Sequence, residues 1–377
     1  MEILTLIWTN GLSFIFILSV IVFIHEMGHY LIARYNGVRI DVFSIGFGPE
    51  LFGWNDSTGT RWKVSLLPLG GYVKMFGDAD AASKPGEELT EMSPEEKEFS
   101  FHHKRLGQRS AIVLGGPLAN FVLAVFIFAI MFATVGQRIT PALISIVQPD
   151  GAAAEAGMIP GDLIIGIDDT AIDRFEMVQR IVRINVEQTL LFTVERDGET
   201  IEMEMTPRLV EVTDDFGNIQ QFGQIGVGRK GVELVRHGPV YAIWAAVEET
   251  ASLTMATLDV LGQIISGNRT AKELGGPIRI AQISGQVAED GLVTVFWFMA
   301  LLSINLGLIN LFPVPMLDGG HLLFYVYEAI RGKPLGERAQ EYGFRVGLAM
   351  VLGLMIFATW NDIKNIFGFD VFFNLFS

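Results

Sequence analysis

The sequence predicts a polytopic α-helical membrane protein with about four spans, one inserted β-rich domain and a membrane-associated β-hairpin. Half of the 377 residues are hydrophobic and the mean hydropathy is +0.40, which is too apolar for a soluble chain of this length. Uncharged runs long enough to span a bilayer lie on both sides of a middle region, and short segments of that region have the alternating pattern of β-strands. The net charge of −15 argues against nucleic-acid partners, and the lack of cysteine excludes disulfides and thiolate metal ligands.

The first span begins with Ile3–Ile24, which holds 22 residues and no charge and is long enough to cross a bilayer. This run exceeds the apolar core of a signal peptide, and no small-residue cleavage site follows it, so we interpret it as a retained span ending near Ala33. It leads directly into the H-E-x-x-H motif that starts at His25. Residues four apart share one face of a helix, so His25 and His29 can bind one metal ion. Glu26 lies beside that face, where it can take a proton from a water; the alternative is a pair of structural histidines at the membrane interface.

A hairpin is predicted between the first two spans. Residues 60–76 form two short strands around Pro68-Leu-Gly-Gly71 in this interpretation. The apolar tip is unusual for a cytoplasmic loop, so it either packs on the membrane face of its own domain or dips into the bilayer. In the second case it offers a strand edge to an extended peptide, whereas the sequence by itself favours simple packing.

Three further spans complete the helical part: Ser110–Val135, Leu292–Phe312 and a shorter one at Val346–Trp360. Basic residues flank the loop between spans one and two and the loop between spans three and four, which predicts that both loops face the cytoplasm. These residues are Arg34, Arg39, Lys104, Arg105, Arg109, Arg331, Lys333, Arg338 and Arg345. Both termini and the middle region then face outward.

The chain divides into residues 1–139, 140–231, 232–291 and 292–377 in this interpretation. Residues 140–231 predict a small β-rich domain with strands at 143–147, 162–168, 189–196, 200–206 and 223–227, helices at 152–157 and 175–184, and a tight turn at 197–198. Residues 232–291 predict an amphipathic linker on the membrane surface, because Glu248, Glu249 and Asp259 interrupt its apolar helical pattern.

The broken third span contains the candidates for a third metal ligand. A catalytic zinc ion needs three protein ligands and one open position. Asp318 follows Pro313-Val-Pro315 at an intramembrane break, where a carboxylate is costly and therefore indicates function. His321 is the rival ligand. Asn310 either bonds a substrate carbonyl or satisfies the broken helix, and the spacing does not decide either question.

Together these motifs resemble the site-2 protease family of intramembrane zinc metalloproteases, with the bacterial regulator-of-sigma-E proteases the most similar group. The resemblance combines the H-E-x-x-H of the first span, N-x-x-P-x-P-x-L-D-G-G from Asn310 in the third, and a domain between them that resembles the PDZ domains of bacterial proteases. The last similarity lies in an A-x-x-A-G-x-x-x-G-D pattern within residues 151–162. The runs 44–48, 70–75, 116–120 and 275–281 extend the resemblance along nearly the whole chain.

The resemblance implies roles for eight residues: Zn²⁺ ligands His25, His29 and Asp318, the acid/base Glu26, and the substrate-binding Asn310, Gly70, Gly71 and Tyr72. It also implies that the hairpin is the strand edge that receives an unwound substrate helix. Some relatives carry two PDZ domains, whereas this chain has room for one PDZ-like domain, which is either a peptide-tail binder, a size gate or a spacer.

The implied activity is cleavage of transmembrane segments of single-span substrates, such as membrane-bound anti-sigma factors or signal-peptide remnants, in regulated intramembrane proteolysis. The implied location is the bacterial inner (plasma) membrane, with the PDZ-like domain and both termini extracytoplasmic and the substrates already trimmed by another protease. A catalytically inactive PDZ-bearing membrane scaffold is the alternative. A transporter with a midplane metal site predicts paired hydropathy repeats, and the sequence has none that we can identify.

Overall fold

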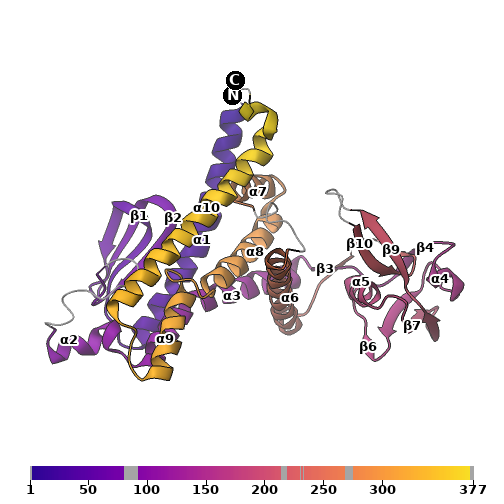
Figure 1. The fold of residues 1–377 in the computed structure, drawn as a ribbon, viewed down its shortest axis with the longest axis horizontal. Coiled ribbons are helices and arrows are strands. Elements are labelled where there is room, and N and C mark those ends of the chain that lie inside the picture. Colours follow the sequence, from indigo (N-terminus) through magenta and orange to yellow (C-terminus); the bar gives the residue numbers. More distant parts are fainter. Residues whose placement is uncertain are drawn as a thin grey trace. The chain divides into compact units, whose positions relative to one another are not determined.

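The structure is a computed structural model that describes residues 2–79, 92–213, 219–229, 231, 233–267 and 275–373 (Figure 1). It contains helices α1 (Glu2–Tyr35), α2 (Pro94–Phe99), α3 (Leu106–Thr134), α4 (Ala152–Glu155), α5 (Phe175–Ile184), α6 (Pro239–Ile265), α7 (Pro277–Glu289), α8 (Leu292–Asn310), α9 (Asp318–Arg331) and α10 (Glu337–Phe373), with a 3₁₀ turn at Phe101–His103. Its strands are β1 (Ile40–Asn55), β2 (Arg61–Met75), β3 (Gln137–Ile139), β4 (Ile144–Val147), β5 (Leu163–Ile167), β6 (Thr170–Ala171), β7 (Leu190–Arg196), β8 (Glu199–Met205), β9 (Arg208–Thr213), β10 (Ile219–Gln224), β11 (Val227–Arg229) and β12 (Glu233–Val235).

Four helical segments are long and apolar enough to cross a membrane: Asn10–Tyr35, Leu106–Thr134, Leu292–Asn310 and Arg338–Ile363. They lie in α1, α3, α8 and α10. Helix α6 is not among these candidates, and its three acidic residues give the physical reason. The chain therefore has the helices of a polytopic membrane protein.

The chain forms two compact units, Met1–Ile130 with Val240–Ser377, and Met131–Pro239. The second unit extends beyond both ends of the predicted domain of residues 140–231. Strand β3 precedes that domain and β12 follows it, and these two strands pair with each other. Every residue of the predicted metal site belongs to the first unit.

Helices α1 and α3 cross at their backbones. A methyl group on Gly28 of α1 would lie 2.1 Å from the carbonyl oxygen of Gly115 in α3. Only hydrogen side chains on both helices permit this approach, as in other membrane helix pairs with small residues at the crossing. The crossing brings the histidine face of α1 against α3.

Strands β1 and β2 are long and bent, and they form more than a simple hairpin. Residues 42–45 of β1 have partners on both sides: residues 71–74 on one side and residues 61–64 on the other. Residues 50–55 then pair with 61–65 beyond them. The segment 71–74 is consequently an outer edge of this sheet.

The predicted strands on either side of Pro68-Leu-Gly-Gly71 are present in β2, but they do not pair with each other as a hairpin. The chain reverses at residues 56–60, where the Asp56 carboxylate accepts hydrogen bonds from the backbone amides of Thr58 and Thr60 and from the Trp62 indole. The chain reverses a second time between residues 64 and 71, because residues 61–64 run parallel to residues 42–45 whereas residues 71–74 run antiparallel to them on the other side. Gly70 lies in this second reversal with a φ of +142°.

The predicted linker of residues 232–291 is incomplete, because its second half is the packed helix α7. Ser284 and Gly285 of α7 are buried, and Gly285 lies against Asn10 of α1. The carboxylate of Asp362 in α10 accepts hydrogen bonds from the amides of Gly276 and Arg279, which caps the start of α7. Helix α7 is thus attached to both ends of the chain.

The second unit has its own core, which includes the fully buried Ile164, Phe192 and Val194. Strands β6, β5, β7 and β8 form its main sheet in that order, and α5 matches the predicted helix at 175–184. Asp197 and Gly198 both have positive φ in the turn from β7 to β8, as a tight hairpin requires. The predicted strand 223–227 is wrong, because Gly226, with a φ of +79°, lies between β10 and β11.

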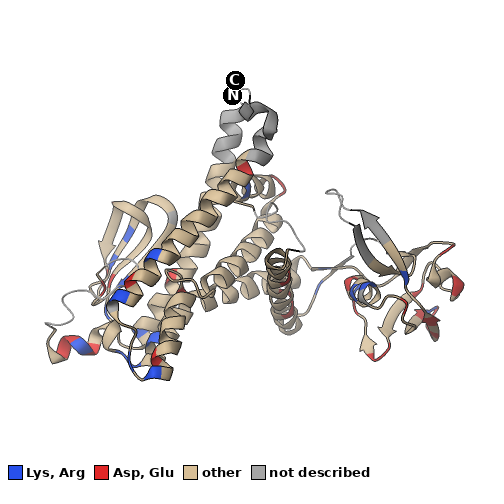
Figure 2. Cartoon of the chain, viewed as in Figure 1, with Lys and Arg blue, Asp and Glu red and all other residues tan. Residues whose placement is uncertain are grey.

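Charge is distributed unevenly within each unit (Figure 2). Lys and Arg gather at the end of the first unit where α9 ends and α10 begins, whereas Asp and Glu are spread over the second unit. The basic cluster is the one from which the sequence predicts a cytoplasmic face.

Candidate metal centre

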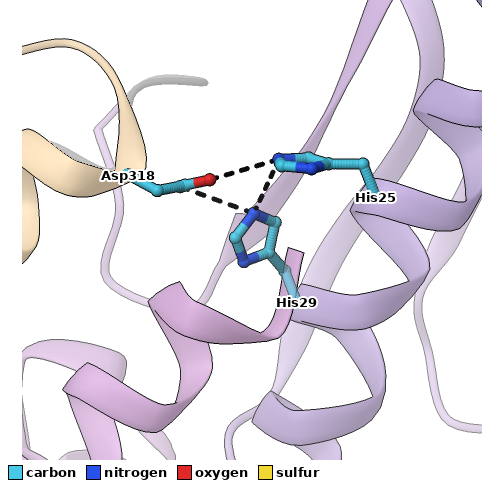
Figure 3. Close-up of side chains that lie close together, drawn as sticks. All are labelled: His25, His29 and Asp318. Carbon is cyan, nitrogen blue, oxygen red and sulfur yellow. Dashed lines mark hydrogen bonds and ion pairs between the residues drawn. The ribbon is translucent and has the colours of Figure 1, made fainter. Parts of the chain in front are cut away.

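Three side chains from two helices meet in the first unit (Figure 3). His25 and His29 lie one turn apart on α1, and Asp318 is the first residue of α9. The His25 Nε2 atom is 3.2 Å from Asp318 Oδ2, the His29 Nε2 atom is 3.5 Å from Asp318 Oδ1, and the two Nε2 atoms are 3.3 Å apart. Both histidines are buried. In the described part of the chain this is the one group of three such ligands close enough to hold an ion.

The separations fit a zinc ion. Bonds of about 2.0–2.1 Å in a tetrahedral arrangement place ligand atoms about 3.3–3.4 Å apart, which is close to the three distances found here. Asp318 Oδ2 is also buried without a hydrogen-bond partner in the structure. A bound cation would satisfy that oxygen and would separate two nitrogen lone pairs that otherwise face each other.

The histidine tautomer agrees with this arrangement. His29 Nδ1 lies 2.9 Å from the carbonyl oxygen of Ile112, and a carbonyl oxygen can only accept. Nδ1 must therefore carry the proton, which leaves the Nε2 lone pair free to bind the metal.

Helix α3 leaves room for an ion at Gly116. A methyl group on Gly116 would lie 2.3 Å from His29 Nε2 and 2.8 Å from His25 Nε2. These are nearly metal–ligand distances, so any side chain at this position would occupy the volume in which an ion would lie.

Glu26 lies beside the three ligands and interacts electrostatically with all of them. Its carboxylate accepts a hydrogen bond from the backbone amide of Val73, and a methyl group on Gly71 would lie 3.1 Å from Glu26 Cγ. The outer segment of β2 is therefore in contact with the candidate catalytic residue.

The other predicted residues have different positions relative to this group. Asn310 Nδ2 is 3.4 Å from His25 Nε2, so the last residue of α8 borders the ligands. Tyr72 stacks on Phe47 with 6.0 Å between ring centroids, while Gly70 lies in the adjacent chain reversal. His321, the rival ligand, lies outside the group and packs its ring near Phe344.

The sequence interpretation assigned no role at the metal to α3. Ile112, Gly116 and Asn120 contact the histidines from one face of this helix, at intervals of four residues. The signal was present in Gly116-Pro-Leu-Ala-Asn120, which we interpreted only as one of the segments that extend the family resemblance. Backbone carbonyls have no sequence signature, so Ile112 could not have been found.

An H-E-x-x-H helix, a distant carboxylate that completes three ligands and a glutamate beside them define the class of metal-dependent peptidases. The chain matches the model of peptidase family M50 over residues 13–354 and belongs to that family. This membership confirms the resemblance to site-2 proteases.

Several relatives are similar over nearly their full length. The protein named "Putative zinc metalloprotease R01501" of Rhizobium meliloti (strain 1021) is 46% identical, covering 94% of this chain and 96% of the relative. "Putative zinc metalloprotease Atu1380" of Agrobacterium fabrum is 48% identical with the same coverage of both chains. "Metalloprotease MmpA" of Caulobacter vibrioides is 38% identical and covers 96% of each chain.

One solved structure is similar to part of this chain. The PDZ domain of the SdrC-like protein of Listeria innocua matches 24% of this chain and 92% of its own, with 20% identity and a TM-score of 0.19.

Proposed function

We propose that this member of the M50 metalloproteases is a zinc-dependent endopeptidase that cleaves transmembrane segments of single-span membrane proteins. The observation that carries the proposal is the group of His25, His29 and Asp318, whose ligand atoms have the spacing of a tetrahedral zinc site. The two histidines lie on α1, a helix of spanning length, and the names of the relatives support zinc as the metal.

The residues divide the chemistry between them. When bound, zinc supplies a Lewis acid that polarises the scissile carbonyl and acidifies a water molecule. Glu26 takes the proton from that water and passes it to the leaving amine, while the Val73 amide keeps its carboxylate oriented. Asn310 borders the ligands and donates a hydrogen bond to the substrate backbone in this scheme.

The direct test replaces the proposed base and keeps the ligands. Glu26→Gln is expected to retain one zinc per chain and to lose cleavage of a single-span test substrate in reconstituted membranes, by about 100-fold or more. Glu98→Gln, an exposed glutamate of α2, is the matched control. Cleavage by Glu26→Gln at the wild-type rate would contradict the mechanism. Wild-type protein that neither binds zinc nor cleaves the test substrate would instead support the alternative, a catalytically inactive scaffold.

The substrate is proposed to bind as an extended strand on the outer edge of β2. Residues 71–74 pair with β1 on one side, and no strand of the described residues pairs with their other side. That segment contacts Glu26 through Gly71 and Val73. A peptide added to this edge would present its carbonyl groups next to the ligands, and an extended backbone is open to attack where a helical one is shielded.

Cross-linking tests this binding mode. The chain has no cysteine, so Tyr72→Cys in the Glu26→Gln background offers a single thiol. It is expected to form a disulfide with a cysteine placed near the substrate's cleavage site, whereas Ser57→Cys at the β1–β2 turn is not. Equal cross-linking from both positions would contradict binding at the edge.

The location and partners are also proposals. We place the chain in a bacterial inner membrane, with the basic end of the first unit in the cytoplasm and the PDZ-like unit and termini outside. Five exposed apolar side chains at the far end of the β1–β2 sheet are suited to contact lipid: Phe47, Leu51, Phe52, Leu66 and Leu67. The proposed substrates are anti-sigma factors or signal-peptide remnants that another protease has trimmed, in regulated intramembrane proteolysis.

A further inference from the structure

Asn120 of α3 is a fully buried polar residue without an evident role in the fold. Its side-chain nitrogen Nδ2 lies 3.1 Å from His25 Nδ1, and its side-chain oxygen Oδ1 has no hydrogen-bond partner. An unsatisfied buried oxygen costs about 1–3 kcal/mol, so it calls for an explanation.

The chemistry of His25 provides the explanation. His25 turns Nε2 towards Asp318 and His29, so a metal ion there binds through Nε2. A neutral imidazole that binds through Nε2 carries its proton on Nδ1 and needs an acceptor at that nitrogen. The Asn120 nitrogen is a donor and cannot fill this role. Rotating the amide by 180° exchanges its oxygen and nitrogen, which have nearly the same shape, and places the unsatisfied oxygen against Nδ1.

We propose that Asn120 positions His25 on the metal, with its side-chain oxygen accepting a hydrogen bond from the Nδ1–H group. This inference rests on the proposed metal centre. It gives the two histidines equivalent partners on one helix, since His29 Nδ1 donates to the carbonyl of Ile112. Ile112 and Asn120 are eight residues apart with Gly116 midway, so one face of α3 supplies an acceptor to each ring and space for the ion between them.

The packing around Asn120 leaves little freedom except rotation of the amide. Ser303 of α8 donates a hydrogen bond of 2.8 Å to its backbone carbonyl. A methyl group on Gly307 would lie 3.2 Å from Asn120 Cβ, so α8 closes over the base of the side chain. The residue is thus fixed between α1 and α8 and can orient a ring without following its motion.

The test compares two variants of the full chain in detergent. Asn120→Leu keeps the volume and removes the acceptor, and it is expected to weaken zinc binding by about 10- to 100-fold. Asn120→Asp keeps an oxygen against Nδ1 and is expected to stay within about threefold of wild type. Ser303→Ala is the control, because it loosens the same contact between α3 and α8 and leaves the acceptor in place.

Zinc affinity is measured by chelator competition, the metal-free melting temperature by thermal unfolding, and the ligand geometry by the absorption spectrum of the Co²⁺ form. An altered Co²⁺ spectrum and weak zinc binding in the Leu variant, rescued in the Asp variant, support the positioning role. Wild-type affinity in the Leu variant overturns it. Equal losses of affinity in the Leu, Asp and Ser303→Ala variants, following their melting temperatures, overturn it in favour of a packing role. If Asn120→Leu does not fold, Asn120→Ala takes its place under the same criteria. Wild-type protein that binds no zinc would overturn the metal centre itself, which is a separate result.

Discussion

Gly116→Ala is expected to prevent zinc binding without unfolding the chain. The added methyl carbon would lie 2.3 Å from His29 Nε2, whereas ordinary van der Waals contact begins at about 3.4 Å, so the nitrogen would have to move by about 1 Å. Ligand distances at a metal site tolerate about 0.2 Å. The ring can rotate away in the metal-free protein, so the cost falls on the metal-bound state.

The magnitude follows from the number of ligands. Structural zinc sites are worth about 10–16 kcal/mol, or about 3 kcal/mol for each of four ligands, which corresponds to about 100-fold in affinity. Since the methyl group also comes within 2.8 Å of His25 Nε2, the loss of affinity is expected to be at least about 100-fold. The assay is zinc affinity by chelator competition, beside the melting temperature of the metal-free chain.

Two other glycines of α3 separate this effect from helix packing. Gly107 faces open space, so Gly107→Ala is expected to leave zinc affinity unchanged and to raise stability by up to about 1 kcal/mol. Gly115→Ala would place a methyl group 2.6 Å from the Gly28 carbonyl oxygen and is expected to destabilise the helix crossing. Stoichiometric zinc of wild-type affinity in Gly116→Ala would refute the assignment of this volume to the metal.

Three further predictions concern the third metal ligand, the start of α7 and the second unit. Asp318→Asn is expected to weaken zinc binding by about 100-fold while His321→Ala stays within about threefold, and the opposite order in a chelator titration would exchange their roles. Asp362→Ala is expected to lower the free energy of unfolding by about 1–2 kcal/mol, because it uncaps α7, and Asp362→Asn by less than half of that; equal thermal unfolding of both variants and wild type would contradict the cap. Burial raises the pKa of Asp162, but hydrogen bonds from Arg196 and a backbone amide hold it below the usual 3.8. The pair therefore stabilises the second unit above about pH 3.8, and this contribution is lost as the pH falls through the lower folded pKa. Arg196→Met is expected to speed backbone hydrogen exchange in β5 and β7 at pH 7. It is also expected to reduce the further loss of protection as the pH falls, whereas exchange like that of wild type would contradict the pairing.

Local sequence signals predicted the parts of the molecule that depend on neighbouring residues. Helical spacing alone places His25 and His29 on one face, and the Asp197-Gly198 turn follows from residues that tolerate positive φ. The carboxylate of Asp318 was predicted as a candidate ligand from a different kind of signal, because an acidic group at an intramembrane break is costly. It narrowed the third ligand to two candidates, and the structure brings Asp318 to the histidines.

Pairing over longer distances determined what the sequence did not reveal. The predicted strands on either side of Pro68-Leu-Gly-Gly71 do not pair with each other, because residues 42–45 of β1 lie between them and pair with both. Helix α7 was missed for a similar reason. Its buried Ser284 and Gly285 give it a weak apolar pattern, and the residue against Gly285 is Asn10, at the other end of the chain.

The role of α3 shows why a ligand motif describes only part of a metal site. The ligands belong to α1 and α9, but the histidine rings gain fixed tautomers and open space from one face of α3. That face presents a backbone carbonyl at Ile112, a missing side chain at Gly116 and an amide at Asn120, three unrelated features that no hydrophobic or polar pattern joins. They act together only because Gly28 and Gly115 let the two backbones touch. A larger residue at that crossing would move both acceptors away from the rings, so helix packing and ligand geometry at this centre depend on the same contact.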